Sequence, residues 1–181
     1  MLVPYLLHAD VGYKMGKAKL TYTFWYASGD DDPNDNDFDA FLAVDVDRED
    51  SQTIFEGNYV DDFTYFTERP YILDKGFIMN KLALDYQWTD KLKVGTAAMY
   101  MMSAEDFEYI DASGNRQSND EIGFEMNAYA KYMLFKNVEF AINAGYLFAD
   151  EAMDFFEIGD QRDGDADEDI FVSSARIRYR F

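Results

Sequence analysis

Seven segments of the sequence alternate between apolar and polar residues with a period of two, and this alternation restricts the fold more than any other feature. Successive side chains of a β-strand point to opposite faces, so each segment is predicted to be a strand with one apolar face. The predicted strands are Leu6–Met15, Ala18–Tyr26, Phe77–Trp88, Leu92–Met102, Ile122–Leu134, Val138–Phe148 and Ile170–Phe181. The chain is therefore predicted to be all-β.

Short and long connections alternate between these strands. The short ones are turns at Gly16, Thr89–Lys91 and Phe135–Asn137, and the long ones are the acidic segments Ser28–Arg69, Ser103–Glu121 and Ala149–Asp169. Transmembrane β-barrels have short periplasmic turns and long extracellular loops. We therefore expect an antiparallel transmembrane β-barrel segment of about seven meander strands.

The two faces of the strands differ sharply in charge. The seven apolar faces carry no charged residue, and their polar residues are Asn80, Thr96 and Ser173. A Lys or Arg that faces the middle of a bilayer costs about 2–4 kcal/mol, so a charge-free face is what lipid requires. The opposite faces carry Lys14, Lys19, Lys81, Lys93, Lys131, Arg176, Arg178 and Arg180 against Asp10, Asp85, Glu125 and Glu139. A soluble lipocalin-like binding barrel, the least favoured alternative, would turn its apolar face inward.

Acidic residues are concentrated in the three long connections. The chain has 36 Asp and Glu against 16 Lys and Arg, and 30 of the 36 lie in those connections. This distribution predicts acidic extracellular loops above a mildly basic lumen. The acidic balance disfavours nucleic acid as a partner.

No pattern of residues indicates an enzyme. The chain has no cysteine and a single histidine, His8, which makes neither a catalytic triad nor a metal cluster. Asp163, Asp165, Asp167 and Asp169 are candidate ligands for loosely bound Ca²⁺ or Mg²⁺, but Glu168 stands where an EF-hand loop needs glycine. We expect no other cofactor.

The last strand ends the chain on an aromatic residue, and it resembles the closing strand of Gram-negative outer-membrane β-barrels. The resemblance implies an outer-membrane location, contact with lipid and lipopolysaccharide, and recognition of Ile177, Tyr179 and Phe181 by the barrel assembly machinery. The aromatic strand that runs into SGDDDPND (Ser28–Asp35) resembles large single-chain porins of the alginate-export type. That family implies a channel for anionic or small polar solutes without catalytic residues.

The resulting functional hypothesis is a porin-like channel segment through which small polar or anionic solutes diffuse. The predicted lumen residues are Lys81, Lys93, Lys131, Arg176, Arg178, Arg180, Asp85 and Glu125. The alternative is a structural or adhesive outer-membrane protein with a closed lumen and functional acidic loops.

The number of predicted strands has a further consequence. Bacterial single-chain barrels have an even number of strands, and seven is odd. We therefore expect residues 1–181 to form one β-barrel domain that is the C-terminal part of a larger barrel. The sheet is predicted to be open, without a continuous ladder between the first and last strands.

Overall fold

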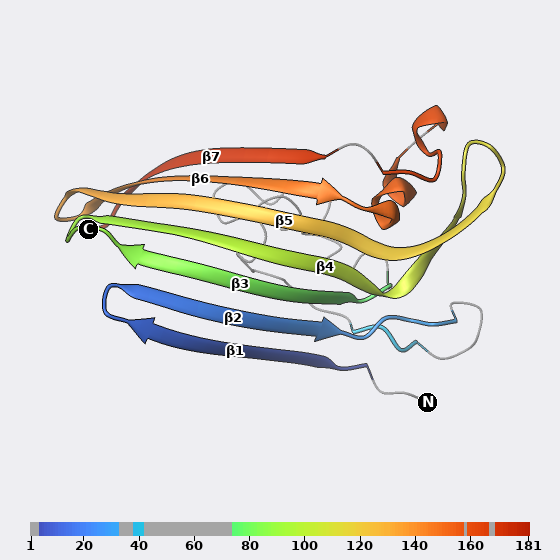
Figure 1. The fold of residues 1–181 in the computed structure, drawn as a ribbon, viewed down its shortest axis with the longest axis horizontal. Helices are drawn as coiled ribbons and strands as arrows, with labels where there is room; N and C mark the ends of the chain where they lie inside the picture. The colour runs from blue at the N-terminus through green and yellow to red at the C-terminus, as the bar shows by residue number, and fades with distance from the viewer. Residues whose placement is uncertain (1–3, 33–37, 42–73, 158, 167–168) are drawn as a thin grey trace.

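The computed structural model describes residues 4–32, 38–41, 74–157, 159–166 and 169–181, and these form one antiparallel seven-stranded sheet (Figure 1). Each strand pairs with the next along the chain, in the order β1 to β7. The strands are β1 (Leu6–Met15), β2 (Ala18–Ala27), β3 (Phe77–Gln87), β4 (Leu92–Ile110), β5 (Arg116–Phe135), β6 (Val138–Ala149) and β7 (Ile170–Tyr179). Two short 3-10 helices, η1 (Glu151–Phe156) and η2 (Gly159–Gln161), lie between β6 and β7. The predicted all-β meander is confirmed.

Five of the strands have the length that crosses a membrane, and two are longer. β1, β2 and β7 each have 10 residues, β3 has 11 and β6 has 12. A transmembrane strand needs about 9–11 residues. β4 and β5 have 19 and 20 residues and continue past the others as a hairpin (Figure 1). Within the described residues, no helix is both long and apolar enough to cross a membrane.

This long hairpin corrects the prediction that Ser103–Glu121 is a loop. Residues Phe107 to Ile110 pair with Arg116 to Asn119, and only the segment around Gly114 forms the turn. The acidic residues of the segment concealed a second alternation, in which Phe107 and Tyr109 share one buried face. Both side chains contact Phe155 of η1, so packing against η1 keeps the extension in strand conformation.

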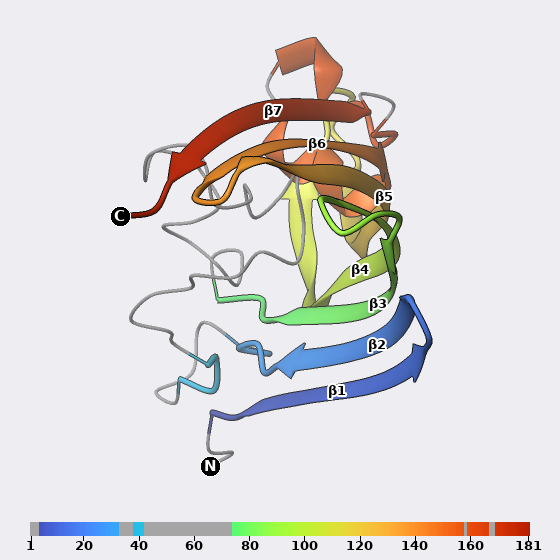
Figure 2. The ribbon, with the colours of Figure 1, turned by 90° about the vertical axis from the view of Figure 1, so that its left-hand side faces the viewer.

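The sheet is curved from β1 to β7, as Figure 2 shows. β1 and β7 form its two free edges, and no ladder joins them within the described residues. The prediction of an open antiparallel sheet is therefore confirmed.

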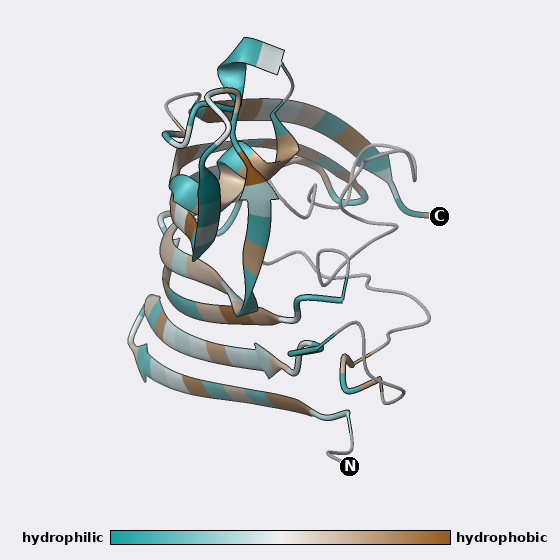
Figure 3. Cartoon of the chain, turned by 90° about the vertical axis from the view of Figure 1, so that its right-hand side faces the viewer, coloured by the Kyte–Doolittle hydropathy of each residue, from teal (hydrophilic) through white to brown (hydrophobic). Residues whose placement is uncertain are grey.

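The apolar face of the sheet is the exposed, convex face. Val11 is 68% exposed, Phe171 is 64% exposed and Ile177 is 69% exposed. Bands of apolar and polar residues alternate along the strands (Figure 3). A soluble barrel buries its apolar face, so the observed arrangement is the reverse of the lipocalin-like alternative.

Polar groups on the convex face have hydrogen-bond partners. The Tyr22 hydroxyl donates to Asn80 Oδ1 at 2.7 Å, and the Thr96 hydroxyl donates to the backbone carbonyl of Asn127 at 2.8 Å. An unsatisfied polar group in hydrocarbon costs several kcal/mol. These two polar positions are therefore compatible with a lipid-facing surface.

A β-bulge in β5 separates the sheet from the long hairpin. Gly123 has φ +134°, and a Cβ atom there would lie 2.2 Å from the carbonyl oxygen of Phe148, so the position requires glycine. Ile122 beside it is fully buried on the inner face. The bulge thus changes which residues face inward at the loop end of β5.

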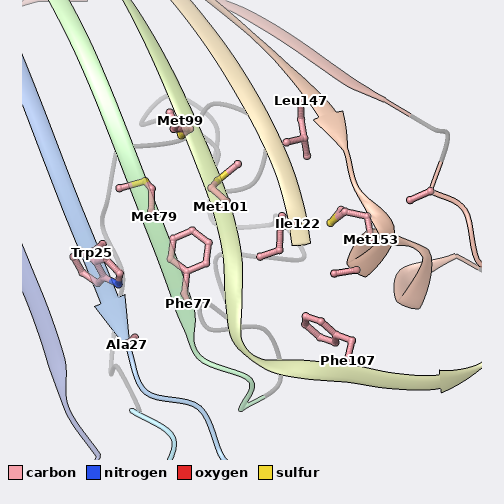
Figure 4. Packing of buried hydrophobic residues seen from close by; sticks show 12 residues of the cluster. Trp25, Ala27, Phe77, Met79, Met99, Met101, Phe107, Ile122, Leu147 and Met153 are labelled. Atoms are coloured by element: carbon pink, nitrogen blue, oxygen red, sulfur yellow. The ribbon is translucent and has the colours of Figure 1, made fainter. Parts of the chain in front are cut away.

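A hydrophobic cluster covers the inner face at the loop end of the strands (Figure 4). Its residues are Trp25, Ala27, Phe77, Met79, Met99, Met101, Phe107, Ile122, Leu147, Ala152, Met153 and Ala166. Ala152 and Met153 come from η1, which follows β6 and lies against this end of the sheet. We call this set the loop-end cluster.

Candidate functional site: the charged inner face

The predicted lumen residues lie on the inner face, and the register distributes them between two levels. Lys81 and Glu125 lie nearer the loops, on either side of Met99, and Glu125 is fully buried. The others lie nearer the turns. The structure therefore does not bring all eight residues into one site.

Asp85, Lys93, Tyr129 and Lys131 form a compact group on β3, β4 and β5, which we call the Tyr129 cluster. Lys93 Nζ lies 3.1 Å from Asp85 Oδ2, and the Tyr129 hydroxyl donates a hydrogen bond to the other oxygen of that carboxylate. The ammonium groups of Lys93 and Lys131 lie 5.6 Å and 5.1 Å from the centre of the Tyr129 ring. Both distances are within the range of cation–π attraction.

Gly95 makes room for the Tyr129 ring. The two residues are directly opposite in the register, and a Cβ atom on Gly95 would lie 2.3 Å and 2.6 Å from two ring atoms of Tyr129. The ring can therefore lie across the backbone of β4 and reach Asp85 on β3 only because residue 95 has no side chain. The sequence prediction missed Tyr129, although an aromatic residue on the polar side of its strand was visible.

Two pairs of lysines lie directly opposite each other on the inner face. Lys14 faces Lys19 across β1 and β2, and Lys93 faces Lys131 across β4 and β5. Like charges at directly opposite positions destabilise a sheet. In the second pair, Asp85 and the Tyr129 ring offset the repulsion. A sheet that keeps both pairs gains a concentrated positive potential at this end of its inner face.

The three arginines near the C-terminus differ in whether an acidic side chain pairs with them. Arg176 is half-buried and its guanidinium donates to Glu139 Oε1 at 3.4 Å. Arg178 and Arg180 are exposed near the turn end of the sheet. Lys131 likewise forms no ion pair with any carboxylate in the described part of the chain. Lys131, Arg178 and Arg180 are therefore the positive groups best placed to meet an anion.

The candidate divalent-cation residues do not converge. Asp163 Oδ1 accepts the backbone N–H of Asp165, and both side chains are exposed. Asp169 accepts the Tyr146 hydroxyl at 2.7 Å, and Asp167 lies outside the described residues. Across the ranges that the structure describes, no three His, Cys, Asp or Glu side chains are grouped so that they could hold a metal ion.

The acidic loop side contains two carboxyl groups whose pKa is raised. Burial raises the pKa of Glu105, and the nearby charge of Asp31 raises it further. Burial likewise raises the pKa of Asp74. Lys75 lies between them: its carbonyl accepts the backbone N–H groups of Ala104 and Glu105. These contacts hold the half-buried Asp74 and Glu105 near each other on the loop side.

The residues of the predicted assembly signal lie on the exposed convex side of the last strand. Tyr179 is 57% exposed, and its ring centre lies 5.5 Å from that of Phe181. Ile177 is on the same face. The accessible position is consistent with recognition by another protein, which stays a prediction.

Comparison with known proteins adds a structural match. No family model matches the chain, and no curated protein matches it. Among solved structures, a NanC porin aligns with this chain at 10% sequence identity and a TM-score of 0.33, and the alignment covers 98% of this chain and 94% of the porin chain. The matched protein is thus a porin, while the alginate-export-type resemblance receives no support from these comparisons. The functional argument below rests on the chain's own geometry.

Proposed function

We propose that this chain forms part of the wall of an outer-membrane β-barrel channel in a Gram-negative bacterium, through which small polar or anionic solutes diffuse passively. One observation carries the proposal: the exposed convex face is apolar along every strand, while the inner face carries charged residues toward the turns. Water would favour the opposite arrangement. Lipid outside and water inside favour the observed one.

The proposed preference for anions rests on the inner face near the turns. The two opposed lysine pairs and the exposed Arg178 and Arg180 outweigh Asp85 and Glu139 there. Rings of charged side chains close to the path of the ion determine the selectivity of pores. No catalytic step is proposed for the channel.

The experiment is reconstitution of the full-length protein in a planar bilayer with a salt gradient. We expect channels whose reversal potential indicates anion preference. Lys131→Glu should shift this potential toward cation preference more than Lys93→Glu, because Lys93 is already paired with Asp85. Equal shifts would contradict the role assigned to the ion pair, and an unchanged potential in both variants would contradict anion guidance.

The second candidate, a structural or adhesive protein with a closed lumen, is favoured by the loop-end cluster. Its apolar side chains fill part of the inner face where a water-filled channel would need polar ones. Bilayer recordings distinguish the two candidates. A folded protein that is extracted only with detergent and never conducts supports the closed lumen.

A further inference from the structure

Fixed charge on this protein is sorted along the direction of the strands. The turn end has ten of the 16 basic residues and only three acidic ones. The basic residues are Lys14, Lys17, Lys19, Lys91, Lys93, Lys131, Lys136, Arg176, Arg178 and Arg180, and the acidic ones are Asp85, Asp90 and Glu139. At the opposite end, the described part of the chain has 19 acidic residues, against the basic residues Lys75, Arg116 and Arg162.

A nearly neutral zone separates the two ends. One row of the register on the inner face has no charge at all: Gly12, Thr21, Ala83, Ala97, Asn127, Gly145 and Val172. Toward the loops it is followed by a row with Asp10, Lys81 and Glu125, and then by the apolar side chains of Trp25, Met79 and Met101. An ion that moves along the inner face from the loop end to the turn end therefore meets an acidic, a nearly neutral and a basic zone in turn.

The zones are far enough apart to act independently. Lys19 and Ala27 are the first and last inner-face positions of β2, and eight residues of strand span about 26 Å. The Debye length is about 8–10 Å at physiological ionic strength. Each zone therefore selects its own counter-ion, cations at the loop end and anions at the turn end.

We propose that the channel rectifies ionic current, with the larger current when the loop side is positive. This inference rests on the proposed channel function. With that polarity, cations enter through the acidic zone while anions enter through the basic zone, so both accumulate in the nearly neutral zone and conductance rises. The opposite polarity withdraws both ions from that zone, and conductance falls.

The test is the current of single channels at equal and opposite voltages in symmetrical salt of about 0.1 M, where the screening length is about 10 Å. Orientation must be known. The chain has no cysteine, so Ser113→Cys in the exposed β4–β5 turn can be biotinylated uniquely. Streptavidin then binds only from the loop side and identifies the chamber that the loops face.

We expect a current ratio of about two or more, since a potential difference of one kT changes the local ion concentration about 2.7-fold and surface potentials reach several kT. In about 1 M salt, where the Debye length is about 3 Å, the ratio should approach one. A ratio of one at low salt, or a larger current with the loop side negative, would overturn the inference while open channels leave the proposed function intact. Complete absence of channels would contradict the proposed function instead.

A variant isolates the basic zone. Lys14→Gln combined with Lys19→Gln removes one opposed lysine pair at an exposed position. We expect the ratio at low salt to fall toward one while the single-channel conductance in about 1 M salt stays unchanged, because charge is then screened within about 3 Å. An unchanged ratio at low salt would show that the basic zone does not cause the asymmetry. A lower conductance at high salt would show that the variant narrows the pore. In that case, Asp160→Asn combined with Asp163→Asn, which removes two negative charges at the exposed loop end, tests the same asymmetry from the acidic side.

Discussion

The fit between Gly95 and Tyr129 gives the most specific test of the inner face. A Cβ atom on Gly95 would lie 2.3 Å and 2.6 Å from two atoms of the Tyr129 ring, whereas unstrained carbon contacts are about 3.5–4.0 Å. Gly95→Ala therefore forces the ring to move by about 1 Å or more. The ring movement breaks the hydrogen bond from Tyr129 to Asp85 and weakens the contacts with both lysines.

The expected change in the free energy of unfolding combines two opposing contributions. Inserting a methyl group into a filled site costs about 1–3 kcal/mol. Replacing glycine by alanine where the backbone permits it contributes about 0.4–1 kcal/mol of stability through the unfolded state. We expect Gly95→Ala to lower the free energy of unfolding by about 1–2 kcal/mol, measured by denaturant titration of the detergent-folded protein with tryptophan fluorescence.

Gly12→Ala is the matched control. Gly12 is also an inner-face glycine of a strand, but the nearest atom to a Cβ there would be Cε of the flexible Lys19 side chain at 3.2 Å, and the Leu20 carbonyl oxygen at 3.9 Å is an ordinary contact. This variant should therefore be neutral or slightly stabilising. In a Tyr129→Ala background, Gly95→Ala should lose its cost, because neighbouring sites that share one contact are coupled. Equal effects at the two glycines, or a cost that persists without the ring, would refute the reasoning.

Two further predictions address the convex face and the loop side. Val11→Arg should destabilise the bilayer-embedded protein by about 2–4 kcal/mol. Thr21→Arg should be tolerated, because residue 21 faces inward between small neighbours. If Val11→Arg left stability unchanged, the result would contradict a lipid-facing surface. Glu105 has a raised pKa, so its charged form opposes folding above that pKa, and this cost disappears as pH falls toward the ordinary glutamate value. Amide hydrogen exchange at Glu105, corrected for intrinsic rates, should therefore slow as the pH falls through the raised pKa of Glu105 toward the ordinary glutamate value. Glu105→Gln should abolish that dependence, and faster exchange at low pH would contradict the assignment.

The strands and their faces could be predicted because alternation is a local property. Every predicted strand is present, and the charge-free faces are the exposed ones. The loop-end cluster was missed because only charged and small residues were sought on the inner face. The segment Ala97–Met102 reads AAMYMM and is apolar on both faces. Such a run is typical of a strand buried on both sides, and it was the available signal.

Contacts between distant residues could not be predicted in the same way. Tyr129 and Asp85 are 44 residues apart, and their hydrogen bond depends on the register across both β3–β4 and β4–β5. A shift of one residue in either pairing would move Tyr129 to the convex face. The bulge at Gly123 shows how readily such a shift occurs, since it places Ile122 on the inner face. Alternation predicts the faces but leaves the register between strands open.

The two free edges of the sheet set the condition under which this wall can enclose a pore. β1 and β7 run in the same direction, because six antiparallel pairings separate them. In lipid, each unpaired backbone group at an edge costs several kcal/mol. An antiparallel closure therefore needs an odd number of strands between β7 and β1. A barrel of about eight strands leaves room only for side chains, whereas 16–18 strands enclose water. The strands that complete the pairing of Leu6–Met15 and Ile170–Tyr179 thus determine whether the Tyr129 cluster faces a solute path or a filled interior, and recordings that show conductance would require the wider closure.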